Sequence, residues 1–388
     1  MTHRSMKDLF LLDKRVTFLN HGSFGATPRP VFDTYLHWQR RLEKQPVQLL
    51  GREYSQEMDN VKRVLGKTIN AEAGDLLMVP NATFAVNMVA RSLNFRNGDE
   101  LLTTSHEYGA CMNIWNCTAA DTGATLIVNH INMPFGTPDD IFEEIWSGIT
   151  DRTQLIFLSH ITSPTAAHLP VERICKEARS AGILTFIDGA HGPGQIDLDM
   201  ERIDADFYTG NCHKWMLAPK SCAFLHIRSE HQHLVHPLVV SWGWNNGPDN
   251  PERSLLQNLQ WMGTIDPSAI FSIPAAIRFQ QDHNWESVRK WSQEVLQEYL
   301  PVFSDTTGIT SVYDSESPQF IQMAAIPLPK LEKPYKLQEQ LLKRFRIEIP
   351  VTECNGRHFL RISFQAYNTR AELDYLADAL KELLPVAG

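Results

Sequence analysis

The sequence predicts an α/β fold in which a large domain carries a mainly parallel, mixed sheet covered by helices, with a smaller α+β domain toward the carboxyl end. Two observations lead to this prediction. Between residues 75 and 228, short apolar runs alternate with helical patterns, which is typical of parallel strands buried on both faces. After residue 267 the pattern is mainly helical and ends in an alternating strand and an amphipathic helix.

The predicted strands of the large sheet are apolar runs bounded by polar or turn residues, at 75–79, 100–104, 125–131, 155–160, 183–188, 206–210 and 222–227. Helical patterns lie between them at 83–93 and 171–182. Toward the carboxyl end we expect helices at 267–303, 337–345 and 369–384 and a strand at 358–367. Because 388 residues is long for one core, we expect an N-terminal arm (1–30), a large domain (31–266), and a helical connection with the small domain (267–388).

Composition argues against several classes of partner. The formal net charge is −9 and there is no long basic run, so neither nucleic acid nor an anionic membrane surface is an expected partner. The first residues lack a signal-peptide core, and no stretch has the roughly 18 apolar residues of a membrane span. The six cysteines are dispersed, without a Cys-x-x-Cys pair or a disulfide-framework spacing. We therefore expect a cytoplasmic protein with reduced thiols.

Two chemically distinctive side chains follow two of the predicted strands. Asp188 ends the run 183–188, and Lys214 comes shortly after the run 206–210. In open parallel sheets, ligands bind beyond the carboxyl ends of the strands. A carboxylate and a lysine at that place suit pyridoxal 5′-phosphate (PLP), because the amine forms a Schiff base while the acid holds the pyridinium nitrogen protonated. The alternative for Asp188 alone is an N-cap or loop carboxylate.

The neighbours of the lysine favour the same chemistry. Lys214 is flanked by His213 and Trp215, a polar and aromatic setting unlike that of a solvated surface lysine. Burial there would lower the pKa of the amine and make it nucleophilic. Lys220, the competing lysine, is interpreted as a turn residue.

Donors for the cofactor phosphate are expected at the start of the helical pattern 83–93. Ala82 and Thr83 follow a predicted strand, and a helix amino terminus is a ready anion site. Thr83 or its neighbour Asn81 could instead be only an N-cap. Asn211 and His213, on the lysine loop, are second candidates for the phosphate.

The cofactor ring needs a stacking partner and a hydrogen bond to its phenolic oxygen. His106 and Tyr108 both follow a strand and have faces that can stack. His191 and the Thr162-Ser163 pair follow other strand ends and could reach the phenolic oxygen. Each of these could also be an ordinary core or loop residue.

A charged residue in the alternating run 358–367 is the candidate for substrate binding. The planar guanidinium of Arg361 can bind a carboxylate in a bidentate way, which suits an amino-acid substrate. An outward-facing strand arginine is the alternative. His231, His233 and His236 resemble a metal site, but without a nearby cysteine or an acidic ligand at helical spacing we expect surface histidines and no metal.

Six ordered motifs resemble one family over nearly the whole chain: LNHGSFGATPRPV, HEYGA, HITSPT, DGAHGPGQIDLD, DFYTGNCHKW and RISFQAYNT. The pattern is similar to the class V aminotransferase family of fold-type I PLP enzymes, which includes the cysteine desulfurases, and within it to isopenicillin N epimerase-like members. The resemblance implies the fold-type I architecture, PLP as cofactor, and a homodimer with the active site at the subunit interface.

The resemblance also implies a role for each matching residue. Lys214 would be the Schiff-base lysine and Asp188 the pyridinium partner, with Tyr108 stacked on the ring. The other expected cofactor contacts are Ala82, Thr83, Asn211 and His213 at the phosphate, His191 and Ser163 near the phenolic oxygen, and Gly263 and Thr264 lent by the neighbouring subunit. The expected substrate contacts are Asn20, His21, Gly22 and Arg361.

The resemblance leaves the reaction open. Epimerisation at the α-carbon of an amino acid is favoured, with Lys214 as base on one face and Tyr108, or a water that it positions, as acid on the other. A β-eliminating carbon–sulfur lyase is the close alternative, followed by an aminotransferase, and a silent PLP-fold binding module is the non-enzyme alternative. Cysteine desulfuration is disfavoured, because the one candidate for a loop cysteine, Cys354, lies only seven residues before Arg361 in a predicted tight turn.

Overall fold

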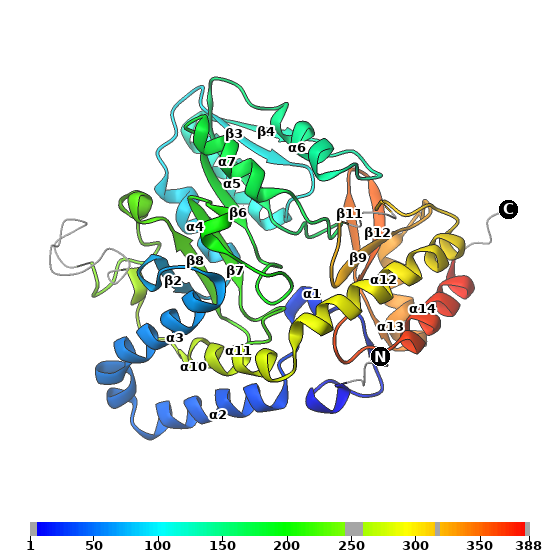
Figure 1. The fold of residues 1–388 in the computed structure, drawn as a ribbon, viewed down its shortest axis with the longest axis horizontal. Coiled ribbons are helices and arrows are strands. Elements are labelled where there is room, and N and C mark those ends of the chain that lie inside the picture. The colour runs from blue at the N-terminus through cyan, green and yellow to red at the C-terminus, as the bar shows by residue number, and fades with distance from the viewer. Residues whose placement is uncertain (1–5, 245–258, 315–318, 385–388) are drawn as a thin grey trace.

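The computed structural model describes residues 6–244, 259–314 and 319–384. Its centre is a seven-stranded sheet in the spatial order β2-β8-β7-β6-β5-β3-β4 (Figure 1). The strands are β2 (Leu76–Val79), β3 (Glu100–Thr104), β4 (Thr125–Asn129), β5 (Thr153–Ser159), β6 (Leu184–Asp188), β7 (Phe207–Asn211) and β8 (Ala223–Ile227). From β4 to β7 the neighbours are parallel, whereas β8 is antiparallel to both β7 and β2. The predicted mixed, mainly parallel sheet is confirmed, with every strand at its predicted place.

Helices cover both faces of this sheet. They are α4 (Ala82–Ser92) and α5 (Gly109–Thr122) on one face, and α6 (Pro138–Trp146), α7 (Val171–Ser180) and the short α8 (Met200–Ile203) on the other. Successive side chains of β5 alternate between the two cores: Leu155 and Phe157 pack with α4 and α5, and Ile156 and Leu158 with α6 and α7. Burial on both faces explains why these strands read as continuous apolar runs.

The segment before the sheet forms long helices that the sequence did not predict. They are α2 (Arg29–Lys44) and α3 (Tyr54–Ile69), joined by a π-helical stretch (Val47–Glu53) and preceded by α1 (His21–Phe24). Both long helices pack against α10 (Ser268–Phe271) and α11 (Ile273–Asp282). In α2 only Val31 is fully buried, and Tyr35, Trp38 and Leu42 on the same face are partly buried against the core. Short 3₁₀ turns lie at Lys7–Leu9, Ala73–Asp75 and Ser229–Leu234.

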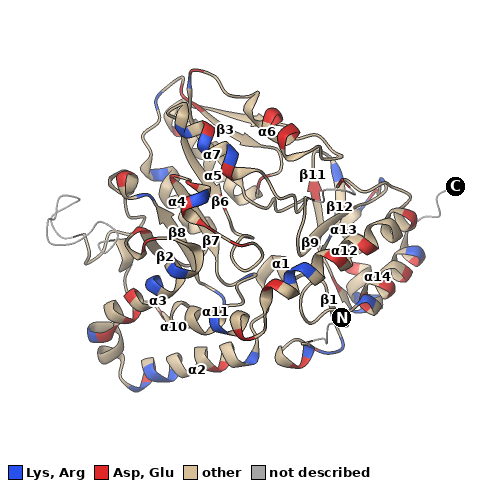
Figure 2. Cartoon of the chain, viewed as in Figure 1, with Lys and Arg blue, Asp and Glu red and all other residues tan. Residues whose placement is uncertain are grey.

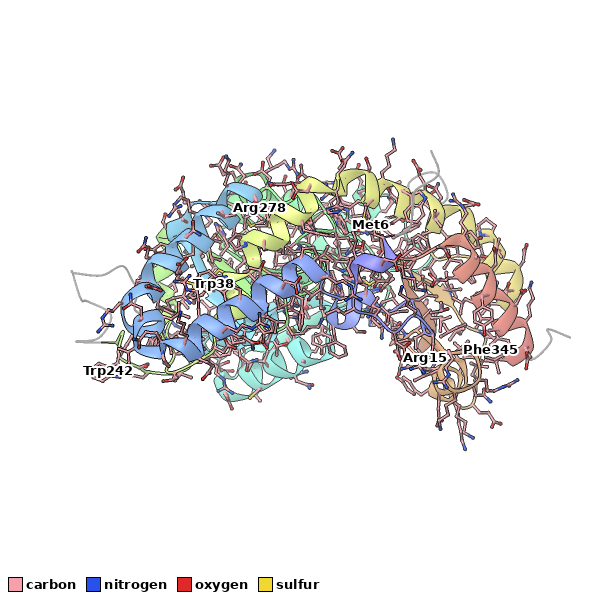
Figure 3. All side chains as sticks on the ribbon, turned by 90° about the horizontal axis from the view of Figure 1, so that it is seen from below. Met6, Arg15, Trp38, Trp242, Arg278 and Phe345 are labelled. Atoms are coloured by element: carbon pink, nitrogen blue, oxygen red, sulfur yellow. The ribbon has the colours of Figure 1, made fainter. Side chains whose placement is uncertain are left out.

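The carboxyl-terminal part contains a small antiparallel sheet in the order β11-β12-β9. Its elements are α12 (Trp285–Thr307), β9 (Met323–Pro327), α13 (Pro334–Phe345), β10 (Ile347–Glu348), β11 (Val351–Cys354), β12 (Arg357–Ser363) and α14 (Arg370–Leu383). β1 (Thr17–Phe18) pairs with β10, so the amino-terminal segment joins this part of the molecule. As a result α1 lies between the two sheets (Figure 1). Figure 3 shows the same two parts, with Trp38 and Trp242 on one and Phe345 on the other.

The surface carries both signs of charge. Basic and acidic residues are interspersed along the outer helices α2, α3 and α14 (Figure 2). Within the described ranges, no helix is long and apolar enough to cross a membrane. The same part of the chain holds no cluster of three His, Cys, Asp or Glu side chains suited to a metal ion; His231 instead contacts Asp206 at 3.0 Å.

Candidate active site

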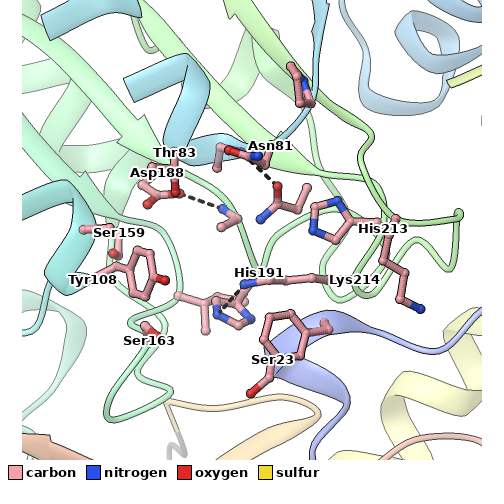
Figure 4. A pocket seen from close by; sticks show the side chains of 18 of the residues that line it. Ser23, Asn81, Thr83, Tyr108, Ser159, Ser163, Asp188, His191, His213 and Lys214 are labelled. Carbon is pink, nitrogen blue, oxygen red and sulfur yellow. Dashed lines mark hydrogen bonds between the residues drawn. The ribbon is translucent and has the colours of Figure 1, made fainter. Parts of the chain in front are cut away.

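A cavity of about 530 Å³ lies beyond the carboxyl ends of β5, β6 and β7 (Figure 4). Because these neighbouring strands are parallel, the residues that follow them meet at one edge of the sheet. The predicted site residues in its wall are Ala82, Thr83, Tyr108, Ser163, Asp188, His191, Asn211, His213 and Lys214. These residues come from five separate parts of the chain, and they meet where the sequence predicts a binding site.

Asp188 and Lys214 both face this cavity. Asp188 is the last residue of β6; one carboxylate oxygen accepts the Ala190 N–H at 2.9 Å, and the other lies 3.4 Å from the Cys111 thiol. Burial raises the pKa of Asp188, although these donors and Lys214 oppose the shift. Lys214 reaches toward His191, and its Nζ lies 3.3 Å from Nε2 of that imidazole (Figure 4).

The pKa of the Lys214 amine is lowered toward neutral pH. Burial and, to a smaller extent, the positive charge of Arg361 together lower the pKa of Lys214 to about 8. Asp188 acts in the opposite direction but does not offset the burial. The amine is therefore a free base in a substantial fraction of molecules at physiological pH, as a nucleophile or general base requires.

The start of α4 offers donors for an anion. Asn81 caps the helix by accepting the Phe84 N–H at 2.9 Å, and the Asn211 side chain accepts the Ala82 N–H at 2.9 Å. The N–H and hydroxyl of Thr83 have no acceptor among the described residues. Asn81 is thus the N-cap, and Thr83 is left available to a ligand at the positive end of the helix.

His213 stands beside this helix start. Its Nδ1 lies 2.9 Å from the Cys222 carbonyl, so Nδ1 carries a proton and Nε2 remains for a ligand. Burial lowers the pKa of His213 to about 4, with Lys214 and Lys220 adding repulsion. An anion bound here would oppose that shift by favouring the charged imidazole.

The structure separates the two candidates for ring stacking. Tyr108 precedes α5, is 48% exposed and lines the cavity. His106 is buried elsewhere, with Nδ1 at 2.8 Å from the Thr165 hydroxyl and Nε2 at 3.2 Å from the Ile131 carbonyl. Thr162 is likewise occupied within its loop, bonded to the Thr165 hydroxyl and to the Ala167 N–H. Of these residues, Tyr108 is the one placed to stack on a ring in the cavity.

Arg361 lies behind the part of the cavity wall that Ser23 and Ser163 form, and it is only 4% exposed. The guanidinium donates from Nη1 to the Ser163 carbonyl at 2.7 Å and from Nη2 to the Ser23 hydroxyl at 3.2 Å. Its Nε–H is buried without an acceptor among the described residues. The interpretation of Arg361 as an outward-facing strand residue is wrong, because β12 directs this side chain toward the cavity wall.

The predicted substrate contacts of the N-terminal segment lie just outside the cavity lining, in which Ser23 and Phe24 appear instead. Asn20 accepts a hydrogen bond from the Ser23 hydroxyl, and the Gly22 N–H donates to Ser363. His21 is fully buried, with Nε2 at 3.0 Å from the Lys214 carbonyl. Asn20, His21 and Gly22 therefore support the wall, and their contact with substrate stays a prediction.

Gly263 and Thr264 do not line this cavity in their own chain. Thr264 is exposed and Gly263 partly so, at the surface of the chain before α10. This placement leaves them available to a second subunit, which is where they were expected to act.

Several residues of the site are not predicted by the sequence. Ser159 ends β5 and lines the cavity, and its N–H and hydroxyl both donate to Glu107, at 2.8 and 2.5 Å. Burial raises the pKa of Glu107 to about 7. Lys220, interpreted as a turn residue, also lines the cavity at its mouth. Their positions in the sequence could have indicated these residues, because Ser159 ends a predicted strand and Glu107 directly precedes Tyr108.

The fold and the cavity together define an α/β enzyme whose lysine and carboxylate are arranged for PLP. A model of the aminotransferase class-V family matches residues 25–376, and the chain belongs to this family. An isopenicillin N epimerase from Amycolatopsis lactamdurans is 35% identical over 385 residues, 96% of each protein. A probable chloroplastic L-cysteine desulfhydrase of Arabidopsis thaliana is 29% identical, over 94% of this chain and 82% of the relative.

The fold has a counterpart among solved structures. The apo cysteine desulfurase from Thermococcus onnurineus NA1 superposes with a TM-score of 0.82 at 18% identity, covering 98% of both chains. Together with the family match, these relatives identify the chain as a PLP-dependent enzyme and not as a silent binding module.

The residues present fit PLP. The cofactor needs an amine, an acid for its ring nitrogen and donors for its phosphate. The cavity supplies Lys214, Asp188 and the unpartnered N–H of Thr83. The buried Nε–H of Arg361 also lacks an acceptor among the described residues, as expected where a ligand group belongs.

Proposed function

We propose that this enzyme epimerises the α-carbon of an amino-acid substrate, with Lys214 on one face and Tyr108 on the other. The observation that carries the proposal is the placement of these two side chains, which enter one cavity from opposite sides (Figure 4). The 35% identity to an isopenicillin N epimerase over nearly the full chain supports the same reaction class. Inversion requires proton exchange on both faces, and these two groups are positioned to provide it.

The cofactor would be held by residues of the large sheet. When bound, PLP takes up the electron pair left on the α-carbon as its proton departs. Asp188 keeps the ring nitrogen protonated, and Tyr108 covers the ring. Thr83 and His213 bind the phosphate at the start of α4, where the helix dipole is positive. His191 donates to the phenolic oxygen, with Ser163 close by.

The substrate would be held from the other side. Arg361 binds the substrate carboxylate through its planar fork, and Ser23 and Ser163 keep the guanidinium in place. Lys214 would take the α-proton, and its pKa of about 8 suits this task. Tyr108, or a water that it positions, returns a proton to the opposite face.

A carbon–sulfur lyase is the second candidate, favoured by the 29% identity to a probable L-cysteine desulfhydrase. It would use the same Lys214 step but needs no acid on the second face. Sulfur transfer through Cys354 is disfavoured by the structure. This thiol ends β11, lies 3.5 Å from the Ser105 carbonyl, and has its pKa raised by burial to about 12. A buried thiol that stays protonated is a poor nucleophile.

Incubation of the PLP-loaded enzyme with single amino acids in deuterated water tests the reaction. Solvent deuterium at the α-carbon with loss of optical purity, both reduced in Tyr108→Phe, would support the epimerase. Release of pyruvate or ammonia, unaffected by Tyr108→Phe, would instead establish the lyase. Formation of a keto acid only when a second keto acid is added would establish an aminotransferase.

We further propose a cytoplasmic homodimer in which Gly263 and Thr264 of each subunit complete the phosphate site of the other. The free state of all six cysteines and the exposed position of Thr264 support this arrangement. Mixing Lys214→Ala with Thr264→Ala subunits should restore activity in hybrid dimers, since each hybrid has one intact site. A monomer in sedimentation experiments would refute the proposal.

A further inference from the structure

Trp215 follows Lys214 in the chain and is completely buried, yet the proposed reaction gives it no task. Its indole Nε1 lies 3.1 Å from Nδ1 of His191. The opposite nitrogen of that imidazole, Nε2, lies 3.3 Å from Nζ of Lys214. Indole, imidazole and amine therefore form a line from the core to the cavity. The ring of His21 packs against the indole, with centroids 4.8 Å apart, and keeps it in place.

The chemistry of these groups determines where the proton of His191 sits. An indole N–H can only donate a hydrogen bond. Nδ1 of His191 must therefore present its lone pair, and the single proton of the neutral imidazole is on Nε2. This Nε2–H is directed at Nζ of Lys214, which can accept it only as a free amine.

The surroundings of His191 disfavour a second proton on its imidazole. Protonation of Nδ1 would set two N–H groups against each other across 3.1 Å. The charged or titratable groups that face the ring are Lys214, Arg361 and His21, and each of them disfavours a positive imidazole. Together with burial, which is the largest cause, they hold the pKa of His191 well below its ordinary value.

We propose that Trp215 is a positioning residue that locks His191 as a permanent hydrogen-bond donor toward the cavity. A locked donor can hold an anionic oxygen, such as the phenolic oxygen of PLP. It cannot pass a proton between substrate and solvent, because its other nitrogen is bonded to an indole that keeps its own proton. His191 is therefore excluded as the second acid of an epimerase and as the acid that protonates a leaving group. The proposal rests on the cofactor contact of His191 but not on the choice of reaction.

The tautomer can be measured directly in the protein without cofactor. Two-bond ¹H–¹⁵N spectra of histidine-labelled protein distinguish protonated from unprotonated ring nitrogens, and His191→Gln identifies the signals of His191. At about pH 9, above the pKa of about 8 of Lys214, we expect a protonated Nε2 and an unprotonated Nδ1. A protonated Nδ1, or an averaged pair of signals, in the unmodified protein would overturn the proposal without any need for a variant.

Trp215→Phe removes the indole donor while keeping an aromatic ring. Trp115 offers a matched control, because it is also fully buried but its Nε1 has no hydrogen-bond partner in the described structure. In Trp215→Phe we expect the His191 signals to average or titrate, and in Trp115→Phe we expect them to match the unmodified protein.

The loaded enzyme gives a second readout. The pH midpoint of the visible cofactor absorbance should shift by about one unit in Trp215→Phe, as loss of one oriented donor to the chromophore implies, and kcat/KM should fall about tenfold. Trp115→Phe should leave the midpoint in place. Equal shifts in the two variants would show that Trp215 acts only through packing. Because the tautomer is read without cofactor, a failed lock is distinguishable from a wrong reaction assignment.

Discussion

The two walls of the cavity are built in different ways. One wall comes from the carboxyl ends of neighbouring parallel strands and carries Asp188 and Lys214. The other joins α1 to β12 through Ser23 and Arg361, which are 338 residues apart in the chain. The first wall is a continuation of a rigid sheet, whereas the second exists only where two parts of the molecule meet. We infer that the first wall holds the cofactor and the second recognises the substrate.

Of the substitutions that test this division between the walls, Lys214→Ala should have the largest effect. The variant loses both the cofactor link and the base, so activity should fall by at least about 10³-fold and the visible absorbance of the bound cofactor should disappear. Lys62→Ala is the matched control, since burial also lowers the pKa of Lys62 to about 8 but this lysine lines a different cavity. Retained absorbance in Lys214→Ala would remove the lysine from its proposed role.

Arg361→Leu should act mainly on the second wall. Loss of a bidentate, charge-assisted contact of about 1.5–3 kcal/mol should raise KM roughly 10- to 100-fold while the cofactor absorbance stays unchanged. Arg357→Leu on the same strand is the control and should leave KM within about twofold, because surface charges contribute little. If Arg361→Leu abolished cofactor binding, the division between the walls would not hold.

The pH dependence of cofactor loading tests the contact between the walls. Only the free amine of Lys214 reacts with PLP, so the rate at which the absorbance grows after mixing apoenzyme with PLP should rise with pH. Because the pKa of Lys214 is about 8, the rate should level off above about pH 8 and not near 10.5, the ordinary pKa of a lysine. Arg361→Leu removes a positive charge that lowers this pKa, so the plateau should move to higher pH, by less than about one unit. A plateau unchanged by the substitution would show that the walls are electrostatically independent.

Cys354→Ser should have the smallest effect. The thiol contributes one weak contact to the Ser105 carbonyl, so epimerase or lyase turnover should stay within about twofold. The measurement is turnover together with sulfur transfer to an added thiol. A selective loss of sulfur transfer would return desulfuration to consideration.

The first wall, which we call the cofactor wall, was predictable because its residues are placed by local features of the sequence. Asp188 and Lys214 follow apolar runs that could be recognised as buried strands, and parallel neighbours bring their carboxyl ends together. Thr83 was predictable on the same ground, since the start of a helix that follows a strand can bind an anion whatever the rest of the fold does. The resemblance to the family then distinguished Tyr108 from His106, which the residues alone did not.

The substrate wall was less predictable because it depends on long-range packing. Nothing in the local sequence indicates that Ser23 rather than Asn20 reaches the cavity; that follows from how α1 packs beneath β12. Glu107 was overlooked for a similar reason, because its partner Ser159 is 52 residues away. The position of Arg361 on its strand was uncertain because an alternating pattern gives two faces without saying which is covered.

The placement of α1 between the two sheets has a consequence for biosynthesis. The Gly22 N–H bonds to the hydroxyl of Ser363, made 341 residues later, and Leu19 bonds to Glu348 and Ser363. On the ribosome, the large sheet has all its strands long before these partners emerge. A nascent chain can thus assemble the cofactor wall early. The wall that binds a substrate carboxylate is completed only near the end of translation.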